Sequence, residues 1–304
     1  MATTVATQQP AESPSTIDLR PPQGWRTNKD RIATFLMLFA FLFALVPLGF
    51  VLYTVISKGI SIISWRFLTG IIPPSISPAN VGGIGPAIVG TLLITAMATV
   101  LAVPLGVLGA VYLNEYGGKG ILAQLINFMS DVMTGVPSIV MGLFLFSIWV
   151  LHFGVSGFAG ALALACLMLP IVIRSTYEML RLVPNSLREG SHALGATKAR
   201  VTMTVVVPAA IGGIVSGALL AVARAAGETA PLLFTILTVT TANPNIFNGA
   251  NTALPAQIFQ NATSAFTGAQ ARAWGSALTL IVIAFVLMIT ARLVTARFTQ
   301  IPED

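Results

Sequence analysis

Two arginines lie inside strongly apolar stretches of this sequence, and each stands four residues before a glutamate. Arg174 and Glu178 form one pair, and Arg224 and Glu228 form the other. Ionisable residues in such stretches are costly in lipid and usually face a cavity or one another. Residues four apart share a helix face, but Arg before Glu is the weaker orientation for a helical ion pair. Since the guanidinium fork also fits an oxyanion, we take Arg224, Glu228 and Arg174 as candidates for a substrate path; the alternative is two structural salt bridges.

The other polar residues do not combine into an enzyme site. His152 and His192 have no cysteine or carboxylate partner at metal-ligand spacing, and paired catalytic carboxylates or nucleophile–base sets are absent. Gly118-Lys119 fails the phosphate-binding loop pattern, because Gly120 stands where Ser or Thr is needed and Leu113 where a glycine is needed. We therefore expect no catalytic residue, no metal site and no cofactor bound by this chain.

The composition indicates a membrane protein. The chain has 304 residues, of which 55% are hydrophobic and only 9% charged, whereas a soluble domain carries about 25% charged residues. Its single cysteine, Cys166, lies in an apolar stretch, so there is no disulfide framework. The net charge of +6 is spread over loop ends rather than gathered in a patch, and we expect membrane lipid around the chain and no nucleic acid.

The candidate residues must therefore be positioned by membrane helices. We predict an all-α, polytopic membrane protein with about six transmembrane helices, since ~30 Å of hydrocarbon needs about 20 apolar residues in a helix. The six spans cover approximately residues 32–57, 86–113, 137–151, 158–180, 205–234 and 274–294. Residues 121–135, between the second and third spans, are expected to lie at the membrane interface.

The distribution of Lys and Arg predicts the orientation and the domains. With six spans and the N-terminus inside, the inner segments hold eleven Lys and Arg, and the outer segments hold three. Basic residues favour the cytoplasmic side, so both termini are expected there. We expect a disordered tail without a signal peptide over 1–30, a first transmembrane helix with an outer loop over 31–84, a five-helix core over 85–297, and a short cytoplasmic tail over 298–304.

Residues 184–208 form a polar, charged loop between the fourth and fifth spans. Ser186 and Glu189 have the Ser-x-x-Glu spacing of a capping box, and Gly195 stands where a short helix would stop. A helix over 187–194 is too short to be stable alone in water. It needs a protein surface to lie in, and small residues allow a close approach. These are Gly190, Ser191, Ala193 and Ala196.

This loop resembles the EAA loop of ABC importer permeases, which reads Glu-Ala-Ala, three residues, Gly, nine residues, Ile-x-Leu-Pro. Here the run 189–191 fills the first three places with Glu-Gly-Ser, Gly195 follows after three residues, and the run 205–208 ends in Pro208. The resemblance implies a type I ABC importer permease fold and a loop that docks into a groove on a cytoplasmic ATPase. The coupling residues that it implies are Ser186, Arg188, Glu189, Gly190, Ser191, Ala193 and Gly195. The alternative is an ordinary polar connector between two membrane helices.

Four further stretches are similar to the PstA-type permease family of the phosphate-specific ABC importer. They are residues 87–92, 104–116, 135–144 and 226–234, among which the Gly-Val-Pro-Ser-Ile-Val and Gly-Glu-Thr-Ala-Pro runs are the most specific. The resemblance covers residues 85–297 and implies a permease subunit of an ATP-driven inorganic phosphate importer in the bacterial inner membrane. It implies as partners a PstC-type permease, two PstB-type ATPase subunits that hold ATP-Mg, and a PstS-type phosphate-binding protein. The alternatives are a permease for another oxyanion, such as molybdate or phosphonate, and an ATP-independent secondary transporter.

Overall fold

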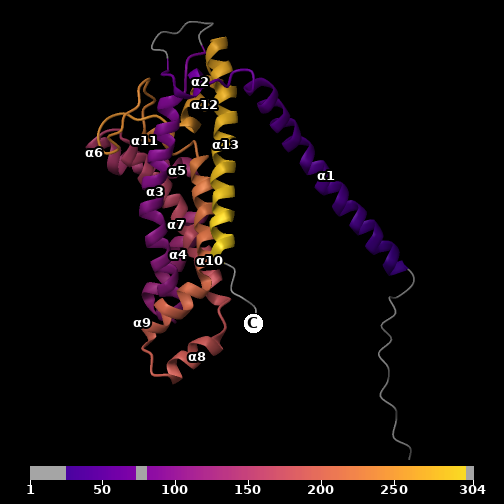
Figure 1. Cartoon of the computed structure of the whole chain (residues 1–304), viewed down its shortest axis with the longest axis vertical. Helices are drawn as coiled ribbons and strands as arrows, with labels where there is room; N and C mark the ends of the chain where they lie inside the picture. The colour runs from indigo at the N-terminus through magenta and orange to yellow at the C-terminus, as the bar shows by residue number, and fades with distance from the viewer. Residues whose placement is uncertain (1–24, 73–80, 299–304) are drawn as a thin grey trace, which may run out of the picture. The chain divides into compact units, whose positions relative to one another are not determined.

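The computed structural model describes residues 25–72 and 81–298, and every regular element within these ranges is a helix (Figure 1). The predicted all-α class is therefore confirmed. Most of the tail expected over 1–30, and all of residues 299–304, lie outside the described residues. Trp25 to Asp30, which were assigned to the disordered tail, are instead the first turns of helix α1, Trp25–Gly59.

The chain divides into two compact units, with the boundary after Tyr53. The first unit holds most of α1, in which Asn28–Gly59 is long and apolar enough to cross a membrane, with mean hydropathy 2.7. Its large apolar side chains are exposed all round the helix, as is expected of a helix surrounded by lipid. This helix corresponds to the first predicted span.

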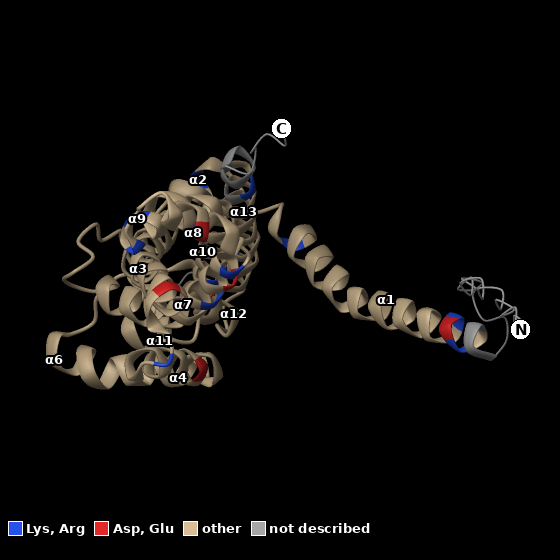
Figure 2. Cartoon of the chain, turned by 90° about the horizontal axis from the view of Figure 1, so that it is seen from below, with Lys and Arg blue, Asp and Glu red and all other residues tan. Residues whose placement is uncertain are grey.

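The second unit contains four more helical stretches that are long and apolar enough to cross a membrane. They are Gly85–Gly117, Gly157–Arg181, Lys198–Ala226 and Thr267–Thr290. The first joins α3, Gly85–Val111, to the π-helix η1, Tyr112–Gly117, and the second is α7, Gly157–Arg181. The third joins α9, Lys198–Val201, and η3, Thr202–Val206, to α10, Val207–Ala226, and the fourth lies within α13, Thr267–Phe298. Charged side chains are few along these helices (Figure 2).

A bent pair of helices replaces the predicted interfacial segment and third span. Helix α4, Ile121–Gly135, is followed by a helical stretch, Ser138–Phe153, at an angle of 108°. The second leg consists of α5, Ser138–Leu145, η2, Phe146–Val150, and α6, Leu151–Phe153. The bend lies at Pro137, because proline forces the preceding residue out of the helical region, and Val136 is extended with φ −73° and ψ 127°. The described residues thus contain five candidate spans, or six if the bent pair counts as one.

The fifth predicted span is displaced towards the N-terminus. It begins at Lys198 rather than near residue 205, and it ends at Ala226 rather than near residue 234. The residues at its start were predicted to be part of the loop because they are polar, but they form the first turns of the helix. Gly227 caps the helix at the other end, so the apolar residues after it belong to a turn and to the short helix α11, Leu232–Thr235.

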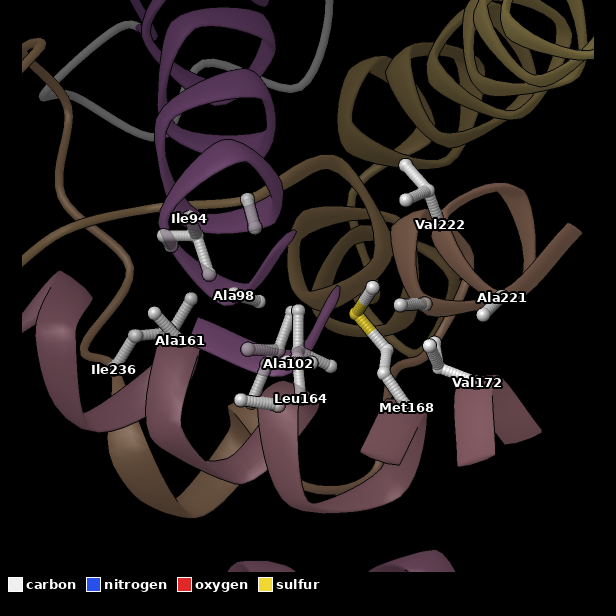
Figure 3. Close-up of a cluster of buried hydrophobic side chains, with 14 of the residues drawn as sticks. Ile94, Ala98, Ala102, Ala161, Leu164, Met168, Val172, Ala221, Val222 and Ile236 are labelled. Carbon is white, nitrogen blue, oxygen red and sulfur yellow. The ribbon is translucent and has the colours of Figure 1, made fainter. Parts of the chain in front are cut away.

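The core is built where α3, α7 and α10 pack together. Ile94, Ala98 and Ala102 of α3 meet Leu164 and Met168 of α7 in one buried cluster (Figure 3). Many of the contacting residues are alanine or glycine, and small residues let membrane helices approach closely without a hydrophobic driving force. The core therefore depends on close helix approach more than on large side chains.

The Gly213-x-x-x-Gly217 motif is part of this packing. A Cβ atom at Gly213 would lie 2.3 Å from the Sδ atom of Met179, and one at Gly217 would lie 2.4 Å from the Oγ atom of Ser175. Both contacted residues are on α7. The motif thus brings α10 against α7 and is explained by helix packing.

The long uncharged segment that follows α11 folds back over the end of the bundle. Its later part forms helix α12, Leu254–Ala262. The backbone N–H of Leu254 donates a hydrogen bond of 2.8 Å to the Oγ1 atom of Thr91 on α3. Next to it, a Cβ atom at Gly90 would come within 1.8 Å of the carbonyl oxygen of Thr252. Only glycine fits there, and this contact fixes α12 against α3.

Candidate functional site

The polar loop between α7 and α9 contains the short helix α8, Asn185–Ala193. The helix starts two residues earlier than predicted, and the predicted capping box is wrong. Its N-cap residue is Pro184, which makes no side-chain cap hydrogen bond, so Ser186 stands inside the first turn. Proline cannot donate a backbone hydrogen bond and is favoured where a helix begins. Pro184 therefore marks the start that Ser186 was expected to mark.

The end of α8 is formed as predicted, at Gly195. This glycine has a φ of +82°, a left-handed conformation that side chains other than glycine rarely adopt. The N–H of Gly195 donates to the carbonyl of His192 at 2.9 Å, and the N–H of Ala196 donates to the carbonyl of Ser191 at 3.2 Å. This pair of hydrogen bonds is the Schellman motif, which satisfies the last carbonyls of a helix.

The surface of α8 is open. None of its residues is buried, and three leucines in and beside it are exposed: Leu182 by 73%, Leu187 by 47% and Leu194 by 90%. The helix lies beyond the end of the bundle near α9 (Figure 1). A nine-residue helix is not stable alone in water, so exposed leucines on such an element favour contact with a further protein.

Arg188 ties α8 to the bundle. Arg188 donates hydrogen bonds to the Glu115 carboxylate from Nε at 3.3 Å and from Nη2 at 3.0 Å. The same guanidinium donates to the carbonyl of Val183 at 2.6 Å and to that of Leu180 at 2.9 Å. Carbonyls at the end of a helix lack intrahelical donors, so Arg188 completes the end of α7 while it binds η1. Of the predicted coupling residues, Arg188 therefore faces the bundle.

A polar cavity of about 520 Å³ adjoins this anchor. Its lining residues come from η1, the end of α7, α8 and the start of α9. They are Asn114, Glu115, Arg181, Asn185, Arg188, Glu189, His192 and Lys198. Glu115 was not among the predicted site residues. It lies 73 residues before Arg188, and its place in a short polar turn gave no sign of this partner.

The second predicted site brings Arg224 and Glu228 together, although not within one helix. The Nε atom of Arg224 lies 3.7 Å from an Oε1 atom of Glu228. Arg224 is in the last turn of α10, where a cation is favoured by the helix dipole, and Glu228 follows the helix end. The Arg224 side chain is 70% exposed, against 21% for Glu228. At 3.7 Å the pair is loose, and the guanidinium fork faces outward from this chain.

Arg174 has a different partner from the one expected. Its Nη2 atom pairs with the Oδ1 atom of Asp131 on α4, and Glu178 is exposed. The arginine and Asp131 side chains are 62% and 57% exposed. Because α4 packs against α7, an acidic residue 43 positions away lies nearer than the one a single turn along the helix. The structure does not bring Arg174 together with Arg224.

No group of three metal-ligating side chains occurs in the described ranges. His152 lies beside Phe153 at the end of α6, and His192 accepts or donates a 3.1 Å hydrogen bond with the carbonyl of Ala196.

Comparison with known proteins gives a matching family model and several relatives. A family model described as "Binding-protein-dependent transport system inner membrane component" matches residues 102–300. The chain is 43% identical to the phosphate transport system permease protein PstA of Yersinia pestis, with 91% of this chain and 94% of the relative covered. It is 42% identical to PstA 1 of Mycobacterium tuberculosis strain H37Rv, covering 93% and 94%, and 40% identical to PstA of Haemophilus influenzae, covering 88% and 94%.

Solved structures share the fold at low sequence identity. A bacterial alginate ABC transporter, in complex with an alginate-bound periplasmic protein, superposes with a TM-score of 0.64 at 14% identity, covering 91% of this chain and 98% of that one. The MetNI methionine ABC transporter in an inward-facing conformation gives a TM-score of 0.55 at 19% identity, covering 72% and 95%. The predicted ABC importer permease fold is confirmed.

Proposed function

The chain belongs to the family of binding-protein-dependent transport system inner membrane components, and we propose that it is the PstA-type permease subunit of an ATP-driven inorganic phosphate importer. The observation that carries the proposal is the 43% identity to a phosphate transport permease over 91% of this chain. The substrate that we infer is therefore inorganic phosphate.

The physical basis for coupling is α8. It is a short helix with exposed leucines, it is rigidly ended by the Schellman motif at Gly195, and it is bound to two bundle elements through Arg188. We infer that a cytoplasmic ATPase of the PstB type binds this surface and that its motion reaches the bundle through Arg188. ATP-Mg is held by that ATPase, and the permease itself is not an enzyme.

The physical basis for the substrate path is the loose ion pair at the end of α10. Phosphate can accept two parallel hydrogen bonds from a guanidinium, and the fork of Arg224 is 70% exposed. A passing phosphate can replace Glu228 as the partner of Arg224 and be displaced by that carboxylate when it leaves. The outward-facing fork also suits a path formed together with a second permease subunit of the PstC type.

The orientation follows from the position of α8. An ATPase binds in the cytoplasm, so α8 and both termini are proposed to lie on the cytoplasmic side, in agreement with the excess of Lys and Arg in those segments. The loop after α11 and helix α12 then lie on the outer side, where a phosphate-binding protein of the PstS type delivers its ligand. The assembly is proposed to lie in the bacterial inner membrane.

The test is uptake of labelled phosphate by cells that lack their own phosphate importer and express this chain with its partner subunits. Excess unlabelled phosphate is expected to abolish the uptake, and excess molybdate or phosphonate is expected to leave it nearly unchanged. Inhibition by molybdate or phosphonate as strong as that by phosphate would assign the permease to another oxyanion.

A further inference from the structure

Helices α12 and α13 bury a group of polar side chains that have atoms without hydrogen-bond partners. Gln257 is 1% exposed, Ser276 is 0% exposed and Arg272 is 7% exposed. The buried atoms without a partner are the Nε2 and Oε1 atoms of Gln257, the Nδ2 atom of Asn261, the Nε atom of Arg272 and the Oγ atom of Ser276. Four of these five atoms can donate a hydrogen bond.

The chain topology brings these side chains to one place. Residues 263–266 join the two helices, which pack against each other. Gln257 stands six residues before this connection and Arg272 six residues after it, so in an antiparallel pair of helices they lie at the same level. Asn261 is one turn from Gln257, and Ser276 is one turn from Arg272, which places each on the same helix face as its neighbour.

A buried cation without a partner is costly. Breaking a buried ion pair by removing one member typically costs about 3–5 kcal/mol, because the remaining charge is uncompensated. Arg272 forms no ion pair with any carboxylate of the described ranges. The three neighbouring groups are mostly donors, so they do not offset its charge. The set is complementary to a group that carries negative charge and accepts several hydrogen bonds.

We propose that Gln257, Asn261, Arg272 and Ser276 form a second binding site for inorganic phosphate, separate from the Arg224–Glu228 pair. The donors match the oxygens of the anion, and the guanidinium offsets its charge. The Oε1 atom of Gln257 accepts from the hydroxyl that phosphate retains near neutral pH, whereas sulfate has no such hydroxyl. The site should therefore prefer phosphate to sulfate. The identity of the oxyanion rests on the proposed function; the need for an anion rests on the buried charge.

A cavity lies beside these residues, on the same two helices. It has a volume of about 360 Å³ and is lined by the residue that follows each member of the site, namely Ile258, Ala262, Ala273 and Ala277. Lys58 also lines it, and its ammonium group lies 4.9 Å from the centre of the Trp274 ring. The cavity therefore has one basic side chain in its wall, and the site itself is too buried for a segment of another protein. With α12 on the outer side, phosphate meets this site before it reaches Arg224.

Binding to the purified complex of this chain with its partner subunits tests the site. The probe is radiolabelled inorganic phosphate, and Arg224→Gln is introduced into every sample to remove the other site. We expect phosphate to bind and to raise the Tm, and sulfate to do so at least ten-fold more weakly. Arg272→Gln should lower the phosphate affinity at least ten-fold. Arg292→Gln, an exposed arginine on the same helix, is the matched control and should bind as the parent does.

A second variant covers the case in which Arg272→Gln fails to fold. Gln257→Glu has nearly the same shape as the parent residue and places a carboxylate beside the guanidinium. It should raise the Tm measured without phosphate and abolish the phosphate-dependent increase. Phosphate binding by both variants as tight as in the parent would overturn the site, as would a parent complex that phosphate does not stabilise. Phosphate uptake is measured separately. If the parent imports phosphate and both variants still bind it as tightly as the parent, the proposed site is wrong but the transport function stands. If phosphate binds at this site but the parent does not import it, only the transport function is refuted.

Discussion

Arg188 of α8 and Glu115 of η1 are joined by two hydrogen bonds, of 3.3 Å and 3.0 Å, although 73 residues separate them. Their side chains are only 16% and 8% exposed. The same guanidinium binds the carbonyls of Leu180 and Val183, so Arg188 links α8 both to the end of α7 and to η1, which continues α3. We propose that the pair passes movements of α8 to the bundle.

Removing this connection should uncouple the importer. We expect Arg188→Met to destabilise the permease by about 3 kcal/mol, since it leaves Glu115 partly buried and uncompensated. Arg188→Met with Glu115→Gln should recover much of that stability but not the coupling. The measurements are the Tm of the complex and the number of ATP molecules hydrolysed per phosphate imported. An unchanged ratio in the double variant would show that the pair serves stability alone.

The left-handed backbone conformation at Gly195 should be needed for coupling to the ATPase. Its φ is +82°, and no atom lies within 4 Å of an added Cβ atom, so Gly195→Ala introduces only backbone strain of about 1–2 kcal/mol. Gly154 has a φ of +83° and equally open space, and its ψ of 174° belongs to a region that only glycine adopts readily, so Gly154→Ala is a control with at least as much backbone strain. Both changes should lower the Tm, and Gly154→Ala should lower it by at least as much as Gly195→Ala. Only Gly195→Ala should weaken retention of the ATPase in a pull-down; equal retention by the two variants would argue against this function of the loop.

The orientation of the chain can be read from cysteine labelling. Cysteines are introduced at Asn248 and Ala193, both exposed, in a background in which Cys166 is replaced by serine. We expect the cysteine at position 248 to react with an impermeant thiol reagent added outside intact cells. The cysteine at position 193 should react only after permeabilisation. The opposite labelling pattern would invert the proposed topology.

The Asp131–Arg174 pair should act mainly in membrane insertion. An unpaired arginine within a membrane helix costs about 2.5–3.5 kcal/mol on insertion scales, so Asp131→Asn should reduce the amount of permease in the membrane. Adding Arg174→Gln should restore that amount. If Arg174 also belongs to the substrate path, the restored double variant imports little phosphate. Normal import by the double variant would remove Arg174 from the path, and membrane level is measured by immunoblot beside uptake.

Local sequence patterns predicted most of the helices, but they did not predict contacts between residues far apart in the sequence. The apolar stretches predicted the membrane helices, and the spacing to Gly195 predicted the end of α8, because both depend on neighbouring residues. The bend at Pro137 was not predicted, because hydropathy gives the length of an apolar helix and not the angle between two successive helices. The partners of Arg188 and Arg174, at separations of 73 and 43 residues, depend on helix packing that no local spacing reveals. For the same reason the buried polar group around Arg272 could be identified only from the packing of α12 against α13.

The central claim is that this chain forms the phosphate path of an ATP-driven importer, with Arg224 on that path. Arg224→Lys should import poorly, because an ammonium group lacks the planar fork that binds two oxygens at once. Arg224→Gln with Glu228→Gln removes both charges and leaves no ion pair to break. This double variant therefore distinguishes an ion pair that only stabilises the structure from one that takes part in transport.

The direct measurement is uptake of labelled phosphate by proteoliposomes that contain the complete assembly, with ATP supplied to the ATPase. The parent is predicted to accumulate phosphate only when ATP is present. The Arg224→Gln, Glu228→Gln double variant is predicted to accumulate none at an equal amount of reconstituted protein. Uptake by the double variant at the parent's rate, or uptake by the parent without ATP, would contradict the account.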